Sequence, residues 1–357
     1  MSLEDPLENW LFLDDLQLPP ERAAFIQAEM RASLDRLTEF LDNPSPKRRD
    51  MRDVRIHRWN VAALAPDDLL RAQTLYRRVY ETGGAGNTYV QEGLLSMIAV
   101  TAGPDSIPFW LDLLSLTRPR DYFSTQRRMM SLAALALLAI RRDTPEAYTA
   151  LRQSAHHSNP NVRALAVDYL GQAYLQAERP LPPDVEAELR EIAVTDAAFG
   201  PRFQARATLR VRQAELPTPM DNPGGVYALK VKFGWDKRIY RTIELRSEQT
   251  LDDLHFAIQR AIKWDADHLY SFYMNGVLRD QRYAFACPYE EDRPPWTDEV
   301  ALGELGLTAG HKFLYYFDYG DSHQFEVEVV GIHPQAKAEA EYPRVVESKG
   351  HAPRQYG

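Results

Sequence analysis

The segment "ELPTPMDNPGGVY", residues 215–227, divides the chain into two parts with different patterns. It holds three prolines and two glycines in thirteen residues. Proline has no amide N–H and glycine favours turns, so a run this dense interrupts helices and strands alike. The chain has 357 residues, which is more than one average domain. We therefore expect two domains, 1–215 and 226–357, joined by a linker at 216–225.

Residues before the linker have the pattern of paired helices. Breaks that contain Pro, Gly or Asn recur at intervals of roughly 15 to 20 residues, about the length of a helix and its turn. Two successive units also align: Leu151 corresponds to Leu189, 38 residues later, and Val162 corresponds to Phe203, 41 residues later. A period near 40 with two helices per unit is typical of HEAT-type repeats. We expect an all-α, HEAT-like solenoid of antiparallel helix pairs, a surface that usually binds a protein partner.

Composition restricts the classes of function. The net charge is −9, and acidic residues outnumber basic ones on both sides of the linker, which disfavours a nucleic-acid partner. Cys287 is the only cysteine, so no internal disulfide forms.

The apolar run "MMSLAALALLAI" (129–140) is too short to span a bilayer and predicts a buried helix. The acidic start "MSLEDPLENW" lacks the pattern of a signal peptide, so we expect a cytoplasmic protein with no membrane partner.

Residues after the linker have the pattern of an α+β domain. Alternation of apolar and polar residues predicts an antiparallel hairpin of strands at 226–234 and 239–246. An amphipathic helix follows, with Thr250 as its N-cap and Asp253 three residues later.

The rest of this part returns to extended structure. We expect one strand at 268–276, a variable insertion at 277–300, a short helical turn at 301–312 and a hairpin at 313–330. The predicted order is two strands, one helix and three further strands. This order makes a mainly antiparallel sheet with one helix packed on it.

Four motifs in this part occur in the order of a known family. They are T-L-x-x-L-H, W-x-x-x-H-L-x-x-F, an Asp-Tyr-Gly-Asp turn and a closing Gly-Pro element. The matching residues are Thr250, Leu251, Leu254 and His255; Trp264, His268, Leu269 and Phe272; Asp318, Tyr319, Gly320 and Asp321; and Gly350 with Pro353. The segment 226–357 thus resembles the plasmid pRiA4b ORF-three-like family, and the resemblance does not extend to the helical part. Family members occur on plasmids and mobile elements, and the resemblance implies a fold without an established activity.

The residues that match the family form a candidate binding cluster, and we expect no catalytic residue, no metal and no cofactor. The cluster consists of His255, Trp264, His268, Phe272, Asp318, Tyr319, Gly320, Asp321 and His323. Two positions depart from the family. His323 stands where the family has tryptophan, and Phe325 stands where it has histidine. After Pro353 the family continues with proline and acidic residues, whereas this chain has Arg354 and Gln355.

The turn in "FLYYFDYGDSHQFEVEVV" (313–330) leaves two interpretations open. If Asp318 and Asp321 converge, an arginine, a cation or a shared proton is needed beside them. If they diverge into hydrogen bonds of the turn, no site is needed, and we favour divergence or an arginine partner. We expect Gly320 to take a positive φ and Asp318 to accept amides of the turn.

The histidines are compatible with two interpretations, a metal site or purely structural roles. Six of the nine lie in the C-terminal part, and His268 or His323 with the two aspartates offers ligands that first-row metals accept. No H-x-x-x-H on a helix or H-x-H on a strand occurs among them. We therefore favour a half-buried His323 at the sheet edge, and we place His255 beside the apolar face of its helix.

Catalytic motifs give no support for an enzyme. The sequence contains no phosphate-binding loop, no G-x-S-x-G and no H-E-x-x-H. We therefore favour a non-catalytic binding or adaptor protein that uses the helical surface and the α+β domain. The alternative is a metal-dependent or nucleic-acid-processing enzyme linked to mobile elements.

Overall fold

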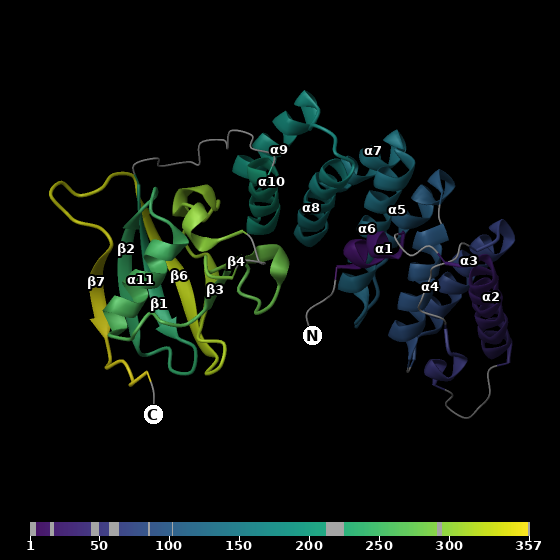
Figure 1. Cartoon of the computed structure of the whole chain (residues 1–357), viewed down its shortest axis with the longest axis horizontal. Coiled ribbons are helices and arrows are strands. Elements are labelled where there is room, and N and C mark those ends of the chain that lie inside the picture. The colour runs from purple at the N-terminus through teal and green to yellow at the C-terminus, as the bar shows by residue number, and fades with distance from the viewer. Residues whose placement is uncertain are drawn as a thin grey trace. The chain divides into compact units, whose positions relative to one another are not determined.

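A computed structural model of the chain describes most of its residues. The described ranges are 5–14, 18–43, 50–56, 64–84, 86–101, 103–211, 225–290 and 295–355. The predicted linker 216–225 lies outside them except for Gly225. The chain forms two compact units, one that ends at Leu181 and one that begins at Pro182 (Figure 1).

The first unit is helical throughout its described part, as the sequence predicts. Its helices are α1 (Pro6–Asp14), α2 (Pro20–Asp42), α3 (Pro66–Thr82), α4 (Asn87–Thr101), α5 (Ile107–Ser115), α6 (Ser124–Arg142), α7 (Pro145–Ser154) and α8 (Pro160–Gln176), with short 3-10 helices at Met51–Val54 and Pro104–Ser106. Proline stands in the first helical turn of six of these eight helices, where its missing N–H and fixed φ cost nothing.

Neighbouring helices of this unit pack as successive hairpins. Helix α3 packs on α4, α5 on α6 and α7 on α8, while α6 also contacts both α4 and α8. Helix α6 therefore has neighbours on several sides, and its residues 129–139 are all buried. This confirms the buried helix predicted from the apolar run. No helix in the described ranges is long and apolar enough to cross a membrane.

The second unit carries the sheet. Its elements are α9 (Pro183–Thr195), α10 (Phe199–Val211), β1 (Val226–Phe233), β2 (Tyr240–Arg246), α11 (Leu251–Ile262), β3 (Tyr270–Tyr273), β4 (Ala284–Ala286), β5 (Lys312–Phe317), β6 (His323–His333) and β7 (Arg344–Lys349), with 3-10 helices at Gln281–Tyr283, Thr297–Glu299 and Leu302–Glu304. The seven strands follow the order β4-β3-β5-β6-β1-β2-β7, and all neighbours are antiparallel. Helix α11 packs on this sheet (Figure 1). The predicted antiparallel sheet with one packed helix is confirmed.

Strands β4 and β7 were not predicted. Strand β4 is three residues long and lies within the segment 277–300 that we expected to be an insertion. Strand β7 is largely exposed, so its residues do not show the alternation that marks a half-buried strand. Both occupy edges of the sheet, where the pattern of burial is weakest.

One face of the sheet forms the core with α11, as the alternation predicts. Phe313, Tyr315 and Phe317 of β5 are buried there with Phe325 and Val327 of β6. On the other face, the Nζ of Lys232 lies 3.1 Å from the Oε1 of Glu326 and 2.5 Å from the Oε2 of Glu328. These cross-strand pairs satisfy the charges that alternate with the apolar row.

Helix α10 packs against the sheet domain and α9 packs on α10, although their sequence pattern groups both with the preceding helices. Phe203 of α10 belongs to the core of this unit and stacks on Tyr283, with ring centroids 5.1 Å apart. The Nη2 of Arg202 donates to the carbonyl oxygen of Gly306 over 3.1 Å. A period of apolar residues shows that a helix has a buried face, but it does not show which element covers that face.

Candidate functional site

Helix α11 begins with a capping box. The backbone N–H of Asp253 donates to the Oγ1 of Thr250, and the N–H of Thr250 donates to the carboxylate of Asp253. Two amide groups that a helix start leaves without partners are thereby satisfied. The cap fixes the register with which α11 presents His255 to the sheet.

His255 lies inside the core and not beside it, in contrast to our expectation from the helical spacing. Its side chain is 1% exposed. Its Nδ1 lies 2.7 Å from the hydroxyl of Tyr315, which also accepts a hydrogen bond from the Nε2 of Gln259. The Tyr315 hydroxyl keeps its own proton available for Nδ1, an arrangement that corresponds to the neutral tautomer with its proton on Nε2.

Burial explains why the imidazole of His255 is neutral. Desolvation disfavours the imidazolium and lowers the pKa of His255 to about 3. The Tyr270 ring covers one face of the imidazole, and the Tyr270 hydroxyl donates to the Oδ1 of Asp252. His255 is therefore a neutral core group whose ring nitrogen is already bonded.

The turn after β5 is organised by Asp318. Its Oδ1 accepts the backbone N–H groups of Gly320 over 3.0 Å and of Asp321 over 3.2 Å, as the sequence predicts. The positive φ angles belong to Asp318 (53°) and Ser322 (58°), so our expectation for Gly320 was wrong. Aspartate tolerates the left-handed region because its short side chain bonds to the nearby backbone.

The second carboxylate oxygen of Asp318 faces the other candidate residues. Its Oδ2 lies 3.6 Å from the Nε2 of His268. Asp318, Asp321 and His323 each offer one ligand atom within 4.8 Å of the others. The turn therefore combines both interpretations: one oxygen of Asp318 stabilises the backbone, and its side chain also converges with Asp321 and His323 and lies near His268. We favoured divergence or an arginine partner, and among the described residues no arginine pairs with Asp318.

His323 is half-buried at the start of β6, as predicted. Its ring centroid lies 4.6 Å from that of Trp264. Its Nε2 is buried and has no hydrogen-bond partner among the described residues. An unpaired buried ring nitrogen is uncommon and costs free energy unless a ligand satisfies it.

The remaining predicted residues do not join this cluster through polar contacts. Phe272 is buried in the core of the sheet. The hydroxyl of Tyr319 bonds to the hydroxyl of Ser271, and its ring stacks on Tyr316. The indole Nε1 of Trp264 donates to the carbonyl oxygen of Pro353 over 2.9 Å. Trp264 thus connects α11 to the C-terminal segment.

Sequence reasoning missed Gln259 and Asp252 as partners of the buried rings. Gln259 lies one helical turn after His255, a spacing that places both on one face, and this was the available signal. Asp252 could not have been assigned, because its contact with Tyr270 depends on how α11 crosses the sheet.

These features define an α+β domain with one antiparallel sheet, one covering helix and a polar turn at a strand end. Residues 225–355 match the family described as plasmid pRiA4b ORF-3-like protein. This confirms the predicted family for the C-terminal part of the chain.

Two relatives extend the comparison. The uncharacterized protein y4hQ of Sinorhizobium fredii (strain NBRC 101917 / NGR234) is 32% identical over 106 residues, which is 29% of this chain and 50% of the relative. The chain therefore spans about half the length of that curated relative. The crystal structure of the protein of unknown function MM3350 from Methanosarcina mazei Go1 is 28% identical, covers 37% of this chain and 73% of that one, and gives a TM-score of 0.33.

Proposed function

We propose that the protein acts by binding and not by catalysis. The helical unit is a HEAT-like repeat that presents a surface to a protein partner, and the pRiA4b ORF-3-like domain supplies a second contact. The observation that carries this proposal is an open hollow between two stacked helix pairs.

Ion pairs between neighbouring helices support the repeat. Arg71 and Arg78 of α3 pair with Asp35 and Asp42 of α2, each at a separation of 36 residues in the chain. The pair between Arg179 and Asp143 has the same separation. Such exposed pairs contribute only about 0 to 1 kcal/mol each, so they indicate a recurring spacing along the chain and not a source of stability.

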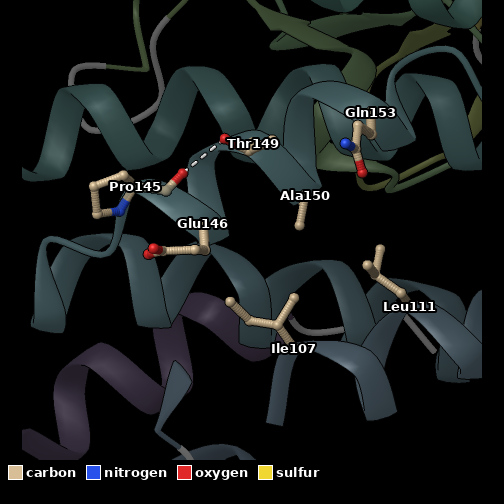
Figure 2. A pocket seen from close by; sticks show the side chains of 7 residues that line it. All are labelled: Ile107, Leu111, Pro145, Glu146, Thr149, Ala150 and Gln153. Atoms are coloured by element: carbon tan, nitrogen blue, oxygen red, sulfur yellow. Dashed lines mark hydrogen bonds between the residues drawn. The ribbon is translucent and has the colours of Figure 1, made fainter. Parts of the chain in front are cut away.

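The hollow lies between α5 and α7 and has a volume of about 260 Å³ (Figure 2). Ile107 and Leu111 of α5 form one wall. Helix α7 contributes Ala150 and the exposed residues Glu146, Thr149 and Gln153. An apolar floor with a polar rim resembles a site for an apolar side chain of a partner. The carboxylate of Glu146 favours a partner in which a basic residue lies next to that apolar side chain.

A single substitution tests this surface in the full chain. Thr149→Trp places a bulky ring in the hollow at an exposed position. The matched control is Thr74→Trp on α3, because both threonines are exposed and both donate their hydroxyl to the carbonyl four residues earlier. We expect proteins captured from an extract of the source cell by the wild type and by Thr74→Trp to be lost with Thr149→Trp. Equal capture by all three, or no capture by the wild type, would count against the proposal.

A second candidate function is binding of a divalent cation at the turn of Asp318. It is favoured by the convergence of Asp318, Asp321 and His323 and by the unpaired Nε2 of His323. Two carboxylates and an imidazole suit first-row metals such as Zn²⁺ or Mn²⁺. A cation held there would support the metal-dependent alternative for the C-terminal part.

Titration calorimetry with Zn²⁺ and with Mn²⁺ distinguishes cation binding at the turn from binding of a protein partner. We expect Asp321→Asn to weaken binding at least tenfold, because it removes a charged ligand from an exposed position. Asp105→Asn, at an exposed position of the helical unit, is the control for loss of one charge. A wild-type protein that binds neither metal would eliminate this second candidate and leave the first intact.

A further inference from the structure

A second hollow lies where α11 ends and has a volume of about 510 Å³. Its walls come from β2, from the residues after α11 and from the segment that follows β7. The charged and aromatic residues that line it are Arg241, Lys263, Trp264, Asp265, His351 and Arg354. This volume is within the range of roughly 300 to 1,000 Å³ that is usual for small-molecule sites.

Hydrogen bonds hold the C-terminal segment in place as one wall. The N–H of Asp265 donates to the Oε1 of Gln355 over 2.6 Å, and the Nε2 of Gln355 donates to the carbonyl oxygen of Asp265 over 3.1 Å. Nearby, the indole of Trp264 donates to the carbonyl oxygen of Pro353. The hollow is therefore a built feature of the fold and not a gap beside a loose end.

Arg241 forms the floor and is 8% exposed. Its Nη1 donates to the carbonyl oxygens of Tyr240, Lys349 and Gly350 over 2.8 to 3.2 Å. Its Nε donates to the carbonyl oxygen of Ala261 in the last turn of α11 over 3.1 Å. All of these acceptors are neutral carbonyls, and within the described ranges the Nη2 of Arg241 has no hydrogen-bond partner.

The Arg241 side chain is largely buried, its Nη2 stays accessible, and no described carboxylate pairs with it. Burial lowers the pKa of Arg241, and no carboxylate acts in the opposite direction. A buried charge is normally paired because its desolvation costs several kcal/mol. The carbonyls of the neighbouring backbone offset part of that cost, and an anion in the hollow would supply the missing charge.

The rim is basic although the chain as a whole is acidic. Lys263 and Arg354 are exposed, and neither forms an ion pair with a described residue. Together with Arg241 they set three cationic groups against the single carboxylate of Asp265. The C-terminal end of α11 alone would repel an anion, but Arg241 already bonds to one of its terminal carbonyls.

We propose that this hollow, the Arg241 pocket, binds the oxyanion group of a small organic molecule. Arginine and lysine groups bind phosphate and carboxylate through charge-assisted hydrogen bonds. The free Nη2 of Arg241 contacts the oxyanion at the floor, and Lys263 and Arg354 hold it from the rim. The proposal is independent of the protein partner and of the cation at Asp318.

Binding measurements on the full chain at constant ionic strength test the proposal. The probes are inorganic phosphate, adenosine monophosphate and acetate, followed by calorimetry and by the NMR signal of the Trp264 indole N–H. Binding of the two phosphates alone indicates a phosphate ester, whereas binding of acetate indicates a carboxylate. We expect the double variant Lys263→Glu and Arg354→Glu to bind at least tenfold more weakly, because both residues are exposed and reversing their charge leaves the fold intact.

The control is Lys337→Glu, an exposed lysine that does not line the pocket. It should retain wild-type affinity for whichever probe binds. The proposal is overturned if no probe binds at millimolar concentration, or if the double variant binds as tightly as the wild type. Neither result affects the capture experiment on α7, so failure of one proposal is distinguishable from failure of the other.

Discussion

The imidazole of His255 lies parallel to the phenol ring of Tyr270, with ring centroids 3.6 Å apart and ring planes within 1° of each other. The contact joins helix α11 to strand β3 in the middle of the core. Because its Nδ1 also bonds to Tyr315 and its side chain is buried, this histidine of the family motif belongs to the packed core of the domain. The same residue should therefore control the response of stability to pH.

We expect His255→Gln to reduce the loss of stability on acidification. The unfolded chain takes up a proton at His255 near pH 6.5, whereas the folded chain does so only near 3. The stabilisation is complete above 6.5 and falls as the pH decreases through this window. Between pH 7 and 5 this removes about 2 kcal/mol of the free energy of unfolding, at ~1.4 kcal/mol per pKa unit. Urea unfolding at both pH values measures the difference.

The control for this measurement is His351→Gln, which changes an exposed histidine. It should leave the pH dependence of the wild type unchanged. If His255→Gln loses as much stability as the wild type between pH 7 and 5, His255 is not the buried neutral group described above.

We expect Asp318→Ala to destabilise the C-terminal unit by about 1 to 3 kcal/mol, because two backbone amides lose their acceptor. The positive φ of 53° adds to this cost for alanine. Asp318→Asn keeps an acceptor and tolerates the same φ, so its cost should be smaller. Asp321→Ala, at an exposed position, should have almost no effect. Equal stabilities of all three variants in urea would contradict this account of the turn.

The buried ion pair between Arg127 and Asp121 in the helical unit should be costly to lose. Arg127 is fully buried, and its Nη1 lies 2.7 Å from the Oδ2 of Asp121. Asp121→Asn leaves the buried guanidinium without its counter-ion, and we expect a loss of about 3 to 5 kcal/mol in the free energy of unfolding.

An exposed pair of the same unit provides the control. The Nη1 of Arg77 lies 2.6 Å from the Oδ2 of Asp112, and both side chains are more than 40% exposed. Asp112→Asn should cost no more than about 1 kcal/mol. Comparable losses in the two variants, measured by thermal or urea unfolding, would show that burial does not set the strength of these pairs.

Local pattern accounts for what could be predicted from the sequence. Alternation located β5 and β6, and the capping box located the start of α11, because both signals lie within a few residues of the chain. The buried position of His255 was missed because the buried face of α11 is wider than the face formed by its apolar residues. It also includes His255 and Gln259. The edge strands β4 and β7 were missed because exposure removes the alternation.

The Arg241 pocket was beyond sequence reasoning for a different reason. Its residues come from segments up to 114 positions apart in the chain, from Arg241 to Gln355. Arg241 itself stands in an ordinary strand pattern, and only the tertiary structure shows that its neighbours are carbonyls and not carboxylates. In the same way, the contact of Phe203 with the sheet could not be read from the helical period of α10.

The most direct test of the central claim is hydrogen exchange of the full chain in the presence and absence of the partner that it captures. If the helical repeat is the binding surface, amides of α5 and α7 should exchange more slowly in the complex, and this protection should disappear with Thr149→Trp and persist with Thr74→Trp. Protection confined to residues 225–355, or unchanged exchange throughout α5 and α7, would contradict the account.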